Sequence, residues 1–319
     1  MATFYSWEDA GSPARNLTGN HQNKIRQILR ACLVDGYGAK PPAGWSMVHE
    51  HANGFSMTNG PGTGIVNFAG GGNEAVSLYL AESVTGTSGA IVVGANVRSG
   101  DYRADDNAAV TSRHTLPTYY VLGSLANTLR WCVVADEKSF VLAMSPETLY
   151  NHSEMLGLYV GEVLNDLGLT GVTNFCAIGG AIGPPDSYNS SAMPLKGGVT
   201  NLRNLATGLY GTTLPYTYPQ STFGTGYIST RAPSPFPSRV NLCQAKVHGG
   251  SGTAWVGRLR GVAYDDYIMK YNVFDAAIAI GLPGSFTGFY KEKDLGDITA
   301  AVLPGLTGSV YLTTDQRFW

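Results

Sequence analysis

The sequence predicts a mainly β protein: antiparallel sheets, arranged as a sandwich or barrel, with one short N-terminal helix and a long Gly/Pro/Ser-rich extension. After residue 45 the chain consists of short apolar and alternating runs separated by glycine clusters, and it contains 41 glycines in 319 residues. Alternation at a period of two with glycine-rich breaks is typical of antiparallel sheets. Regular alternation of strands with helices, which would indicate a parallel sheet, is missing.

The helix is predicted to begin near His21 and to end before Asp35–Gly38. Apolar residues recur there at helical spacing, and they form one stripe: Ile25, Ile28, Leu29, Cys32 and Leu33. A single apolar stripe is typical of a helix that lies on a core. Thr18 and Asn20 are candidate N-caps, and the glycines of Asp35–Gly38 can adopt the positive φ of a helix C-cap.

A rigid connector is predicted after the helix, over Val34–Trp45. It contains Pro41 and Pro42, and consecutive prolines keep the backbone extended. We expect this connector to deliver Trp45 and Met47 onto a first strand.

Short strands are predicted in the following part of the chain. Phe55–Phe68 is expected to form a hairpin that turns at Asn59–Gly62, and residues 76–81 alternate in the manner of a half-buried strand. Residues 90–97 form another apolar run. The polar segment 99–114 is expected to be an exposed loop.

A central hairpin is predicted from Leu129–Ala135 and Ser139–Met144, joined by the polar turn Asp136–Lys138. Ser145–Thr148 offers a short helical start. Further strands are predicted at 119–122, 156–164 and 174–178, although Glu154–Leu167 also has helical spacing.

The chain is predicted to divide into a helix plus β domain (1–182), an irregular interface extension (183–237) and C-terminal strands (238–319) that complete the same β domain. The extension is rich in Gly, Pro, Ser and Thr, and long irregular connections are typical of binding loops. We expect it to become ordered only against neighbouring subunits; the alternative is an insertion packed on its own domain. Aromatic side chains dominate protein interfaces, and the candidate interface residues are Tyr188, Tyr210, Tyr216, Tyr218, Phe223, Tyr227, Phe318 and Trp319.

The C-terminal part is predicted to begin with a hairpin of Val240–Val247 and Trp255–Ala263 around a Gly-Gly-Ser-Gly turn. An aromatic stripe follows within Val262–Ile280, and such a stripe is typical of a core or an interface. The terminal pair Phe318–Trp319 is costly to leave in water, so we expect it to be docked.

Composition argues against several classes of function. There are 21 basic and 23 acidic residues, with no run of either sign, so neither nucleic acid nor an anionic membrane is an expected partner. Charged residues make up 14% of the chain, against about 25% in an ordinary domain. Interface cores exclude charge, so much of the outer face is expected to be covered by other subunits. The alternative is a neutral, glycine-rich domain that stands alone.

The cysteines and the N-terminus indicate a reducing cytoplasm. None of the four cysteines lies in a Cys-x-x-Cys pair, and each is in an apolar context. The N-terminus lacks the basic and apolar regions of a signal peptide, and no apolar run reaches about 18 residues, so membrane insertion is not expected.

Candidate catalytic and metal-binding residues are few. His49 and His51 are expected on one strand face with Glu50 on the other, but a metal site would need a third donor such as His114, His152 or His248. Asp101–Asn107 has oxygen ligands but lacks the ligand spacing of a calcium-binding loop. Asp265–Asp266 could be a carboxylate pair for glycoside hydrolysis, but adjacent side chains diverge, so a partner from elsewhere in the chain would be required. Two glycine-rich segments lack the context of a phosphate site and are predicted turns: Gly60–Gly64 and Gly70–Glu74. We therefore expect no catalytic residues, no cofactor and no bound metal.

Three segments and the end of the chain carry a resemblance to a known family. They are Cys32-Leu-Val-Asp-Gly-Tyr-Gly-Ala-Lys-Pro-Pro-Ala-Gly-Trp45, Arg130-Trp-Cys-Val-Val-Ala-Asp-Glu-Lys-Ser-Phe-Val-Leu142, Gly257-Arg-Leu-Arg-Gly-Val262 and the final Trp319. They resemble segments of virion structural proteins of tailed bacteriophages that are associated with the tail tip or baseplate. In that family the corresponding segments are an N-terminal helix and connector, a central hairpin, an Arg-rich strand and the chain end. The long glycine-rich regions between them depart from that family.

The resemblance implies an assembly protein of the virion tail, formed in the host cytoplasm. Its expected partners are other virion proteins and copies of itself in a threefold or sixfold ring. The alternatives are a capsid or collar decoration protein, or a receptor-binding or glycan-degrading tail protein; the sequence lacks the repeats of a glycan-degrading β-helix.

Overall fold

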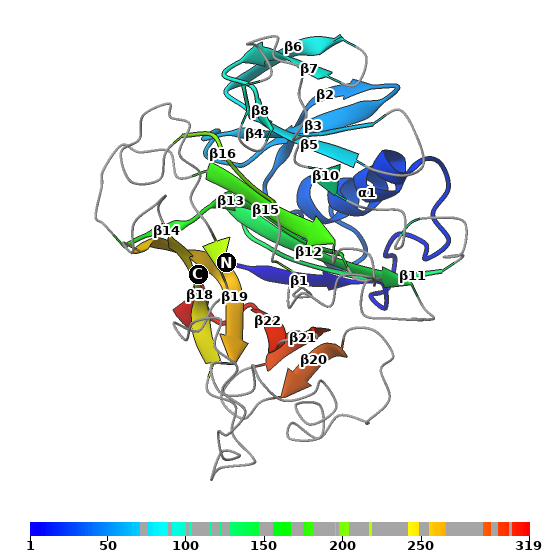
Figure 1. The fold of residues 1–319 in the computed structure, drawn as a ribbon. Helices are drawn as coiled ribbons and strands as arrows, with labels where there is room; N and C mark the ends of the chain where they lie inside the picture. The colour runs from blue at the N-terminus through cyan, green and yellow to red at the C-terminus, as the bar shows by residue number, and fades with distance from the viewer. Residues whose placement is uncertain are drawn as a thin grey trace, which may run out of the picture.

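The structure is a computed structural model that describes residues 1–70, 76–88, 91–99, 102–103, 115–116, 122, 128–146, 156–166, 175–181, 195, 198–203, 217–218, 242–248, 255–265, 290–294, 299–305 and 308–319. These residues form mainly antiparallel strands with a short helix near the N-terminus, which confirms the predicted fold class. Figure 1 shows them as stacked layers, with the green central strands between the blue and cyan N-terminal part and the yellow to red C-terminal part.

The central sheet has six strands in the order β1-β11-β12-β13-β15-β16. Its strands are β1 (Thr3–Ser6), β11 (Leu129–Ala135), β12 (Ser139–Pro146), β13 (Leu156–Glu162), β15 (Phe175–Ala181) and β16 (Gly198–Asn201). The predicted hairpin of β11 and β12 forms its middle, with Ala135 opposite Phe140 across the turn. β1 was not predicted from the sequence.

The second sheet has the order β2-β3-β4-β5-β8-β9, with β10 beside β5. Its strands are β2 (Ser46–His51), β3 (Gly54–Thr58), β4 (Ile65–Ala69), β5 (Val76–Ala81), β8 (Arg98–Ser99), β9 (Tyr102–Arg103) and β10 (Thr115–Leu116). The strands β6 (Ser83–Ser88) and β7 (Ile91–Ala95) form a separate two-stranded ribbon. The hairpin predicted at Phe55–Phe68 is confirmed as β3 and β4.

The third sheet has the order β17-β18-β19-β22-β21-β20, with β14 (Leu164–Asn165) beside β19. Its strands are β17 (Thr217–Tyr218), β18 (Leu242–His248), β19 (Trp255–Asp265), β20 (Tyr290–Asp294), β21 (Thr299–Gly305) and β22 (Gly308–Thr313). A 3-10 turn, η4 (Gln316–Phe318), follows β22. The predicted C-terminal hairpin is confirmed as β18 and β19.

The central sheet is buried on both faces. On β11, Trp131 and Val133 belong to a core shared with the helix and the second sheet, whereas Cys132 and Val134 belong to a core shared with the third sheet. A sheet covered on both faces needs nearly continuous apolar strands, and this explains why β11 and β12 carry apolar residues at successive positions. The three sheets are therefore stacked in layers.

The helix α1 (His21–Arg30) continues into a π-helical turn, η1 (Ala31–Asp35). Asn20 caps its start, because the Asn20 side chain accepts a hydrogen bond from the backbone N–H of Asn23. All members of the predicted apolar stripe are buried. Gly36 ends the helix with φ of 74°, as predicted, and a Cβ there would lie 2.8 Å from the carbonyl oxygen of Lys40.

The connector after the helix is fixed by backbone hydrogen bonds. The N–H of Ala43 donates to Cys32 O, and the N–H groups of Gly44 and Trp45 both donate to Leu33 O. These bonds satisfy carbonyls that have no partner within the helix. The connector thus delivers Trp45 directly into β2, as predicted.

Several sequence-based expectations are wrong in detail. β5 is buried on both faces rather than half-buried, because Tyr79 and Ala81 are covered by the β6–β7 ribbon. Ser145 and Pro146 continue β12 and do not start a helix. The helical alternative for Glu154–Leu167 is also wrong, since this segment contains β13.

Other predictions fall largely outside the described residues. In the expected loop 99–114, Ser99 is buried in β8 and residues 102–103 form β9, while the rest is not described. Of the strand predicted at 119–122 only Leu122 is described, and this residue is helical, so the prediction is wrong there. The extension 183–237 is described only at 195, 198–203 and 217–218, where β16 and β17 join the central and third sheets. The three-part domain division stays a prediction.

We predict that Leu33→Ala lowers the free energy of unfolding by about 2–5 kcal/mol, because it truncates a fully buried side chain of the helical stripe. Equilibrium denaturation in urea measures this loss. Val48→Ala is the control, since Val48 is 40% exposed on β2 and its truncation is expected to cost less than about 0.5 kcal/mol. Equal losses for the two variants would contradict the burial of the stripe.

Candidate functional site

The three sheets meet at a polar junction around the turn between β11 and β12. Asp136 closes this turn: its Oδ1 accepts hydrogen bonds from the backbone N–H groups of Lys138 and Ser139, each at 2.9 Å. The polar turn predicted at Asp136–Lys138 therefore forms, and its carboxylate is almost completely buried.

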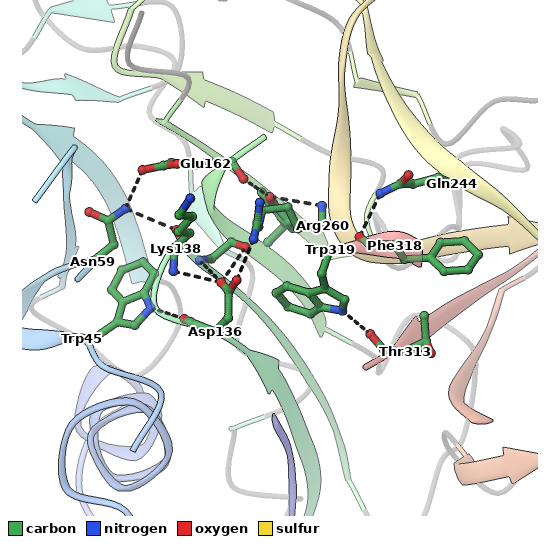
Figure 2. A network of polar contacts seen from close by, with 12 residues as sticks. Trp45, Asn59, Asp136, Lys138, Glu162, Gln244, Arg260, Thr313, Phe318 and Trp319 are labelled. Atoms are coloured by element: carbon green, nitrogen blue, oxygen red, sulfur yellow. Dashed lines mark hydrogen bonds and ion pairs between the residues drawn. The ribbon is translucent and has the colours of Figure 1, made fainter. Parts of the chain in front are cut away.

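Two residues from distant parts of the chain bind the same turn. Trp45 Nε1 donates to the carbonyl oxygen of Asp136 at 2.9 Å, and Arg260 Nη2 forms an ion pair with Asp136 Oδ2 at 2.7 Å. Figure 2 shows both contacts on either side of Asp136. The connector, the central sheet and the third sheet are thus joined through one residue.

The turn between β3 and β4 is bound to the other side of the junction. The backbone N–H of Gly60 donates to Glu137 O at 2.8 Å, and Asn59 Nδ2 donates to Lys138 O and to Glu162 Oε1 at 3.3 Å each (Figure 2). Thr63 Oγ1 also donates to Glu162 Oε1, at 2.8 Å. The predicted turn at Gly60–Gly64 is confirmed, and its role is to fix the second sheet to the central hairpin.

The C-terminal aromatic pair closes the junction from the third sheet. Trp319 Nε1 donates to Thr313 O at 2.6 Å, and the guanidinium of Arg260 lies 5.8 Å from the centre of the indole ring (Figure 2). Gly261 adopts φ of 68°, and a Cβ there would lie 2.2 Å from the Trp319 ring, so only glycine fits. Phe318 is buried, and its carbonyl accepts from Gln244 Nε2 at 2.9 Å.

The prediction that Phe318–Trp319 is docked is therefore confirmed, and the surface that receives this pair belongs to the same chain. Phe318 is one of the candidate interface residues, but its ring is almost wholly covered within the subunit. Tyr218 lies in β17, opposite Lys246 of β18. The remaining candidate interface residues are outside the described part of the chain: Tyr188, Tyr210, Tyr216, Phe223 and Tyr227.

The chemistry of the junction is structural. Both carboxylate oxygens of Asp136 accept hydrogen bonds from the protein, so this group could act as a base only by breaking the turn or the ion pair. Burial raises the pKa of Tyr159 well above its usual range, and its hydroxyl donates to Glu162 O at 2.5 Å. The phenol is thus neutral and fixed.

The histidine pair lies where the alternation of β2 predicts. The rings of His49 and His51 share one face, with their centres 5.4 Å apart, while Glu50 on the other face forms ion pairs with Arg26 and Arg30 of α1. The helix is therefore bound to β2 through Glu50, and this carboxylate is not directed at the imidazoles.

The His51 ring lies against the β2–β3 turn. Nδ1 accepts a hydrogen bond from the backbone N–H of Asn53 at 3.3 Å, and a Cβ at Gly54 would lie 2.8 Å from Nε2. Burial lowers the pKa of His51, with a smaller effect from the neighbouring His49. A neutral ring that accepts at Nδ1 carries its proton on Nε2. His51 acts here as the cap of the β2–β3 turn.

No cluster of three metal-ligating residues occurs in the described ranges. Of the proposed third donors, His248 ends β18 in the third sheet, and the central sheet separates it from β2. The other two, His114 and His152, are not described. Asp101, Asp105–Asn107 and Asp266 are also outside the described residues.

The cysteines behave as the sequence predicts where their side chains are described. Cys32, Cys132 and Cys176 are buried in the two cores, and burial raises the pKa of Cys176 well above its usual range. They pack as small apolar residues. Cys243 is described only as part of β18.

Sequence patterns predict the turn at Asp136–Lys138 but none of the long-range contacts that join it to the other sheets. Trp45 is 91 residues from Asp136, and Arg260 is 124 residues from it. Asn59 and Glu162 are separated by 103 residues. Each of these contacts can be predicted only when the stacking of the sheets is known.

Comparisons with known proteins supply no family for this chain. No family model matches it, and a search of curated proteins finds no match. Among the described residues, no helix has the length and apolar character needed to cross a membrane.

We predict that Arg260→Met lowers the free energy of unfolding by about 3 kcal/mol, because it leaves the buried carboxylate of Asp136 without its counter-ion. Arg258→Met is the matched control two residues away on β19. Its ion pair with Asp166 is much more exposed (40% and 31%, against 13% and 10%), so the expected loss is below about 1 kcal/mol. Denaturation of both variants measures the difference, and an equal loss would contradict the role of the junction.

We also predict a stability change at acidic pH that depends on His21. Burial, followed by the charge of Lys24, lowers the pKa of His21 to about 4, so the folded state holds a neutral ring where the unfolded chain binds a proton. Stability should therefore fall as the pH falls from about 6.5 to about 4, by at most on the order of 3 kcal/mol from this group.

The difference between the wild-type protein and His21→Gln isolates this effect. Denaturation midpoints measured across the same pH range should approach each other on acidification, because glutamine cannot bind the proton. A difference that stays constant with pH would show that His21 titrates normally.

Proposed function

We propose that this protein is a structural component of a tailed-phage virion, working as a tail-tip or baseplate assembly protein through protein–protein interfaces. The observation that carries the proposal is the convergence of the segments that resemble that family. Trp45 ends the first segment, Asp136 lies in the second and Arg260 in the third, and both Trp45 and Arg260 bind Asp136 (Figure 2). The terminal Trp319 lies against Arg260.

This convergence favours a likeness of architecture over a coincidence of short stretches. Buried polar contacts are directional, and they specify one arrangement of the elements that they join. Trp45, Asp136 and Arg260 each lie in a segment that resembles the family. Their meeting in one junction therefore implies a similar stacking of the connector, the central hairpin and the β19 strand. The likeness concerns the scaffold, and it supports the family more strongly than any one segment could.

Two further observations favour a role in assembly. The carboxylates and the tyrosine of the junction are bonded within the chain, which suits a rigid subunit better than a reaction centre. Charged residues make up only 14% of the chain, as expected for a protein whose outer face is covered by neighbours. Under this proposal the partners are other virion proteins and copies of this chain in a threefold or sixfold ring. The protein acts without catalysis in the virion tail and assembles in the host cytoplasm.

The test is the composition and structure of purified virions. We expect quantitative mass spectrometry to find the protein in a copy number that is a multiple of three or six, and electron cryo-microscopy to place its density at the tail tip or baseplate. Absence from virions would contradict the proposal. Density on the capsid or collar would identify a decoration protein, and density at a fibre tip would identify a receptor-binding or glycan-degrading protein.

A second arm of the test uses the junction. Virions produced with Arg260→Met in place of the wild-type protein should contain fewer complete tails, because the subunit that must enter the ring is less stable. The Arg258→Met variant should assemble normally. Tail counts from electron micrographs compare the two.

A further inference from the structure

The β6–β7 ribbon is separate from the three stacked sheets. In the part of the chain that the structure describes, β6 and β7 pair only with each other, and they lie at the outer end of the N-terminal half (cyan, top of Figure 1). A two-stranded ribbon alone is at best marginally stable in water. The stability of the ribbon therefore depends on contacts at its base and on its faces.

The base of the ribbon is firmly anchored. The backbone N–H of Glu82 donates to Ala95 O at 3.0 Å, and the Glu82 carboxylate accepts from Asn96 Nδ2 at 2.6 Å and from Arg203 Nε at 3.0 Å. Asn96 adopts φ of 53°, which turns the chain back toward the second sheet. The ribbon thus leaves the body of the protein in a fixed direction.

One face of the ribbon is attached to the second sheet. Val92 is buried in a small core with Tyr79, Ala81 and Val97, and Val84 packs against it. The next residue along β7, Val93, has its side chain on the opposite face and is 45% exposed. Only three large hydrophobic side chains are exposed in the described residues, and Val93 is one of them.

β7 lacks the devices that normally prevent strand pairing between molecules. Residues 83–95 contain no charged residue and no proline, whereas edge strands are usually protected by lysine, proline or a bulge. β6 carries a bulge at Thr85, between the pairs Val84–Gly94 and Gly86–Val93. β7 has no bulge, so its backbone is the more regular template for another strand.

We propose that β7 pairs antiparallel with β7 of a second copy of this chain, so that two ribbons form one four-stranded sheet across a twofold axis at Val93. This register places Val93 opposite its own copy, Ile91 opposite Ala95 and Val92 opposite Gly94. On either side of the Val93 pair each larger side chain faces a smaller one, and no like charges meet. The twofold contact is self-complementary because the same strand supplies both sides.

The neutrality of the ribbon favours a second copy over a foreign partner. Partner choice in strand pairing is commonly set by charge patterns, and residues 83–95 offer none to match. In a twofold antiparallel pair the residue on the axis faces its own copy, so a charge there would be repelled; the axial residue here is the uncharged Val93. A twofold contact does not close a threefold or sixfold ring, so this pairing would join two subunits or two rings and does not depend on the proposed function.

The test is sedimentation analysis of the full chain over a concentration series. We expect the wild-type protein to form twofold complexes, and Val93→Lys or Val93→Glu to weaken them by about tenfold or more, since each places like charges directly opposite at the axis. An equimolar mixture of Val93→Lys and Val93→Glu should recover the complex, because the opposed charges then differ in sign. If the free chain also forms rings, the single variants should halve the observed mass.

Val48→Lys is the matched control, because Val48 is exposed to a similar degree (40%) on β2. It should leave association unchanged. The proposal is overturned if the wild-type chain shows no twofold complex up to about 1 mM, because a dissociation constant above about 1 mM is too weak for a specific contact. Equal association of the Val93 variants, or equal loss with Val48→Lys, would also overturn it.

Disulfide trapping gives a second readout that does not depend on affinity. Paired residues on adjacent antiparallel strands have Cβ atoms about 4.5–5.5 Å apart, close to the spacing that a disulfide needs. Val93→Cys should therefore form a covalent dimer on mild oxidation, and Val48→Cys should not. Failure of Val93→Cys to cross-link at concentrations where the wild type associates would contradict the register.

Discussion

The stacking of this protein depends on the buried carboxylate of Asp136. Hydrophobic burial holds the three sheets together, but it is non-directional and would permit one layer to slide over another. A buried charge permits no such freedom, because it must keep its hydrogen bonds and its counter-ion. Asp136 obtains these from its own turn and from Arg260, while its carbonyl binds Trp45. The connector and the third sheet can both bind Asp136 in only one relative position. The turn at Asp136 therefore determines how the layers are placed on one another.

Local patterns were sufficient for most of the elements. The stripe of Ile25 and Leu29, the cap at Asn20 and the hairpins β3–β4, β11–β12 and β18–β19 follow from residues that are close together in sequence. β1 could not be found in this way, because four residues contain too little alternation and its partner is β11, with Thr3 opposite Ala135. The burial of both faces of β5 was missed for a related reason. It results from the ribbon folding over Tyr79, which is a tertiary contact that the period of one strand does not encode.

The candidate site shows the same limit. The two-residue period of a strand was enough to place His49 and His51 together and Glu50 apart. It could not show that the backbone N–H of Asn53 donates to Nδ1 of His51, because this depends on how tightly the β2–β3 turn closes. The two turns of the junction were predictable, but the contacts between them were not, since the partners lie 91 to 124 residues apart. Long-range polar contacts become predictable only when the order and stacking of the sheets are known.

The two faces of the second sheet have different roles: one packs in the main core, and the other carries the ribbon that makes the proposed contact. Its inner face, which includes Leu78 and Leu80, packs in the core with α1 and the central sheet, while its outer face carries the ribbon through Tyr79 and Ala81. The side chain of Val93 points away from both, so a change there removes no core contact. Conversely, the contacts of Asp136 and Arg260 do not involve the ribbon. β5 thus contributes to the main core of the subunit with one set of side chains, and with the other set it supports the ribbon that carries the proposed contact. The two properties can then change independently, because few contacts are shared between them.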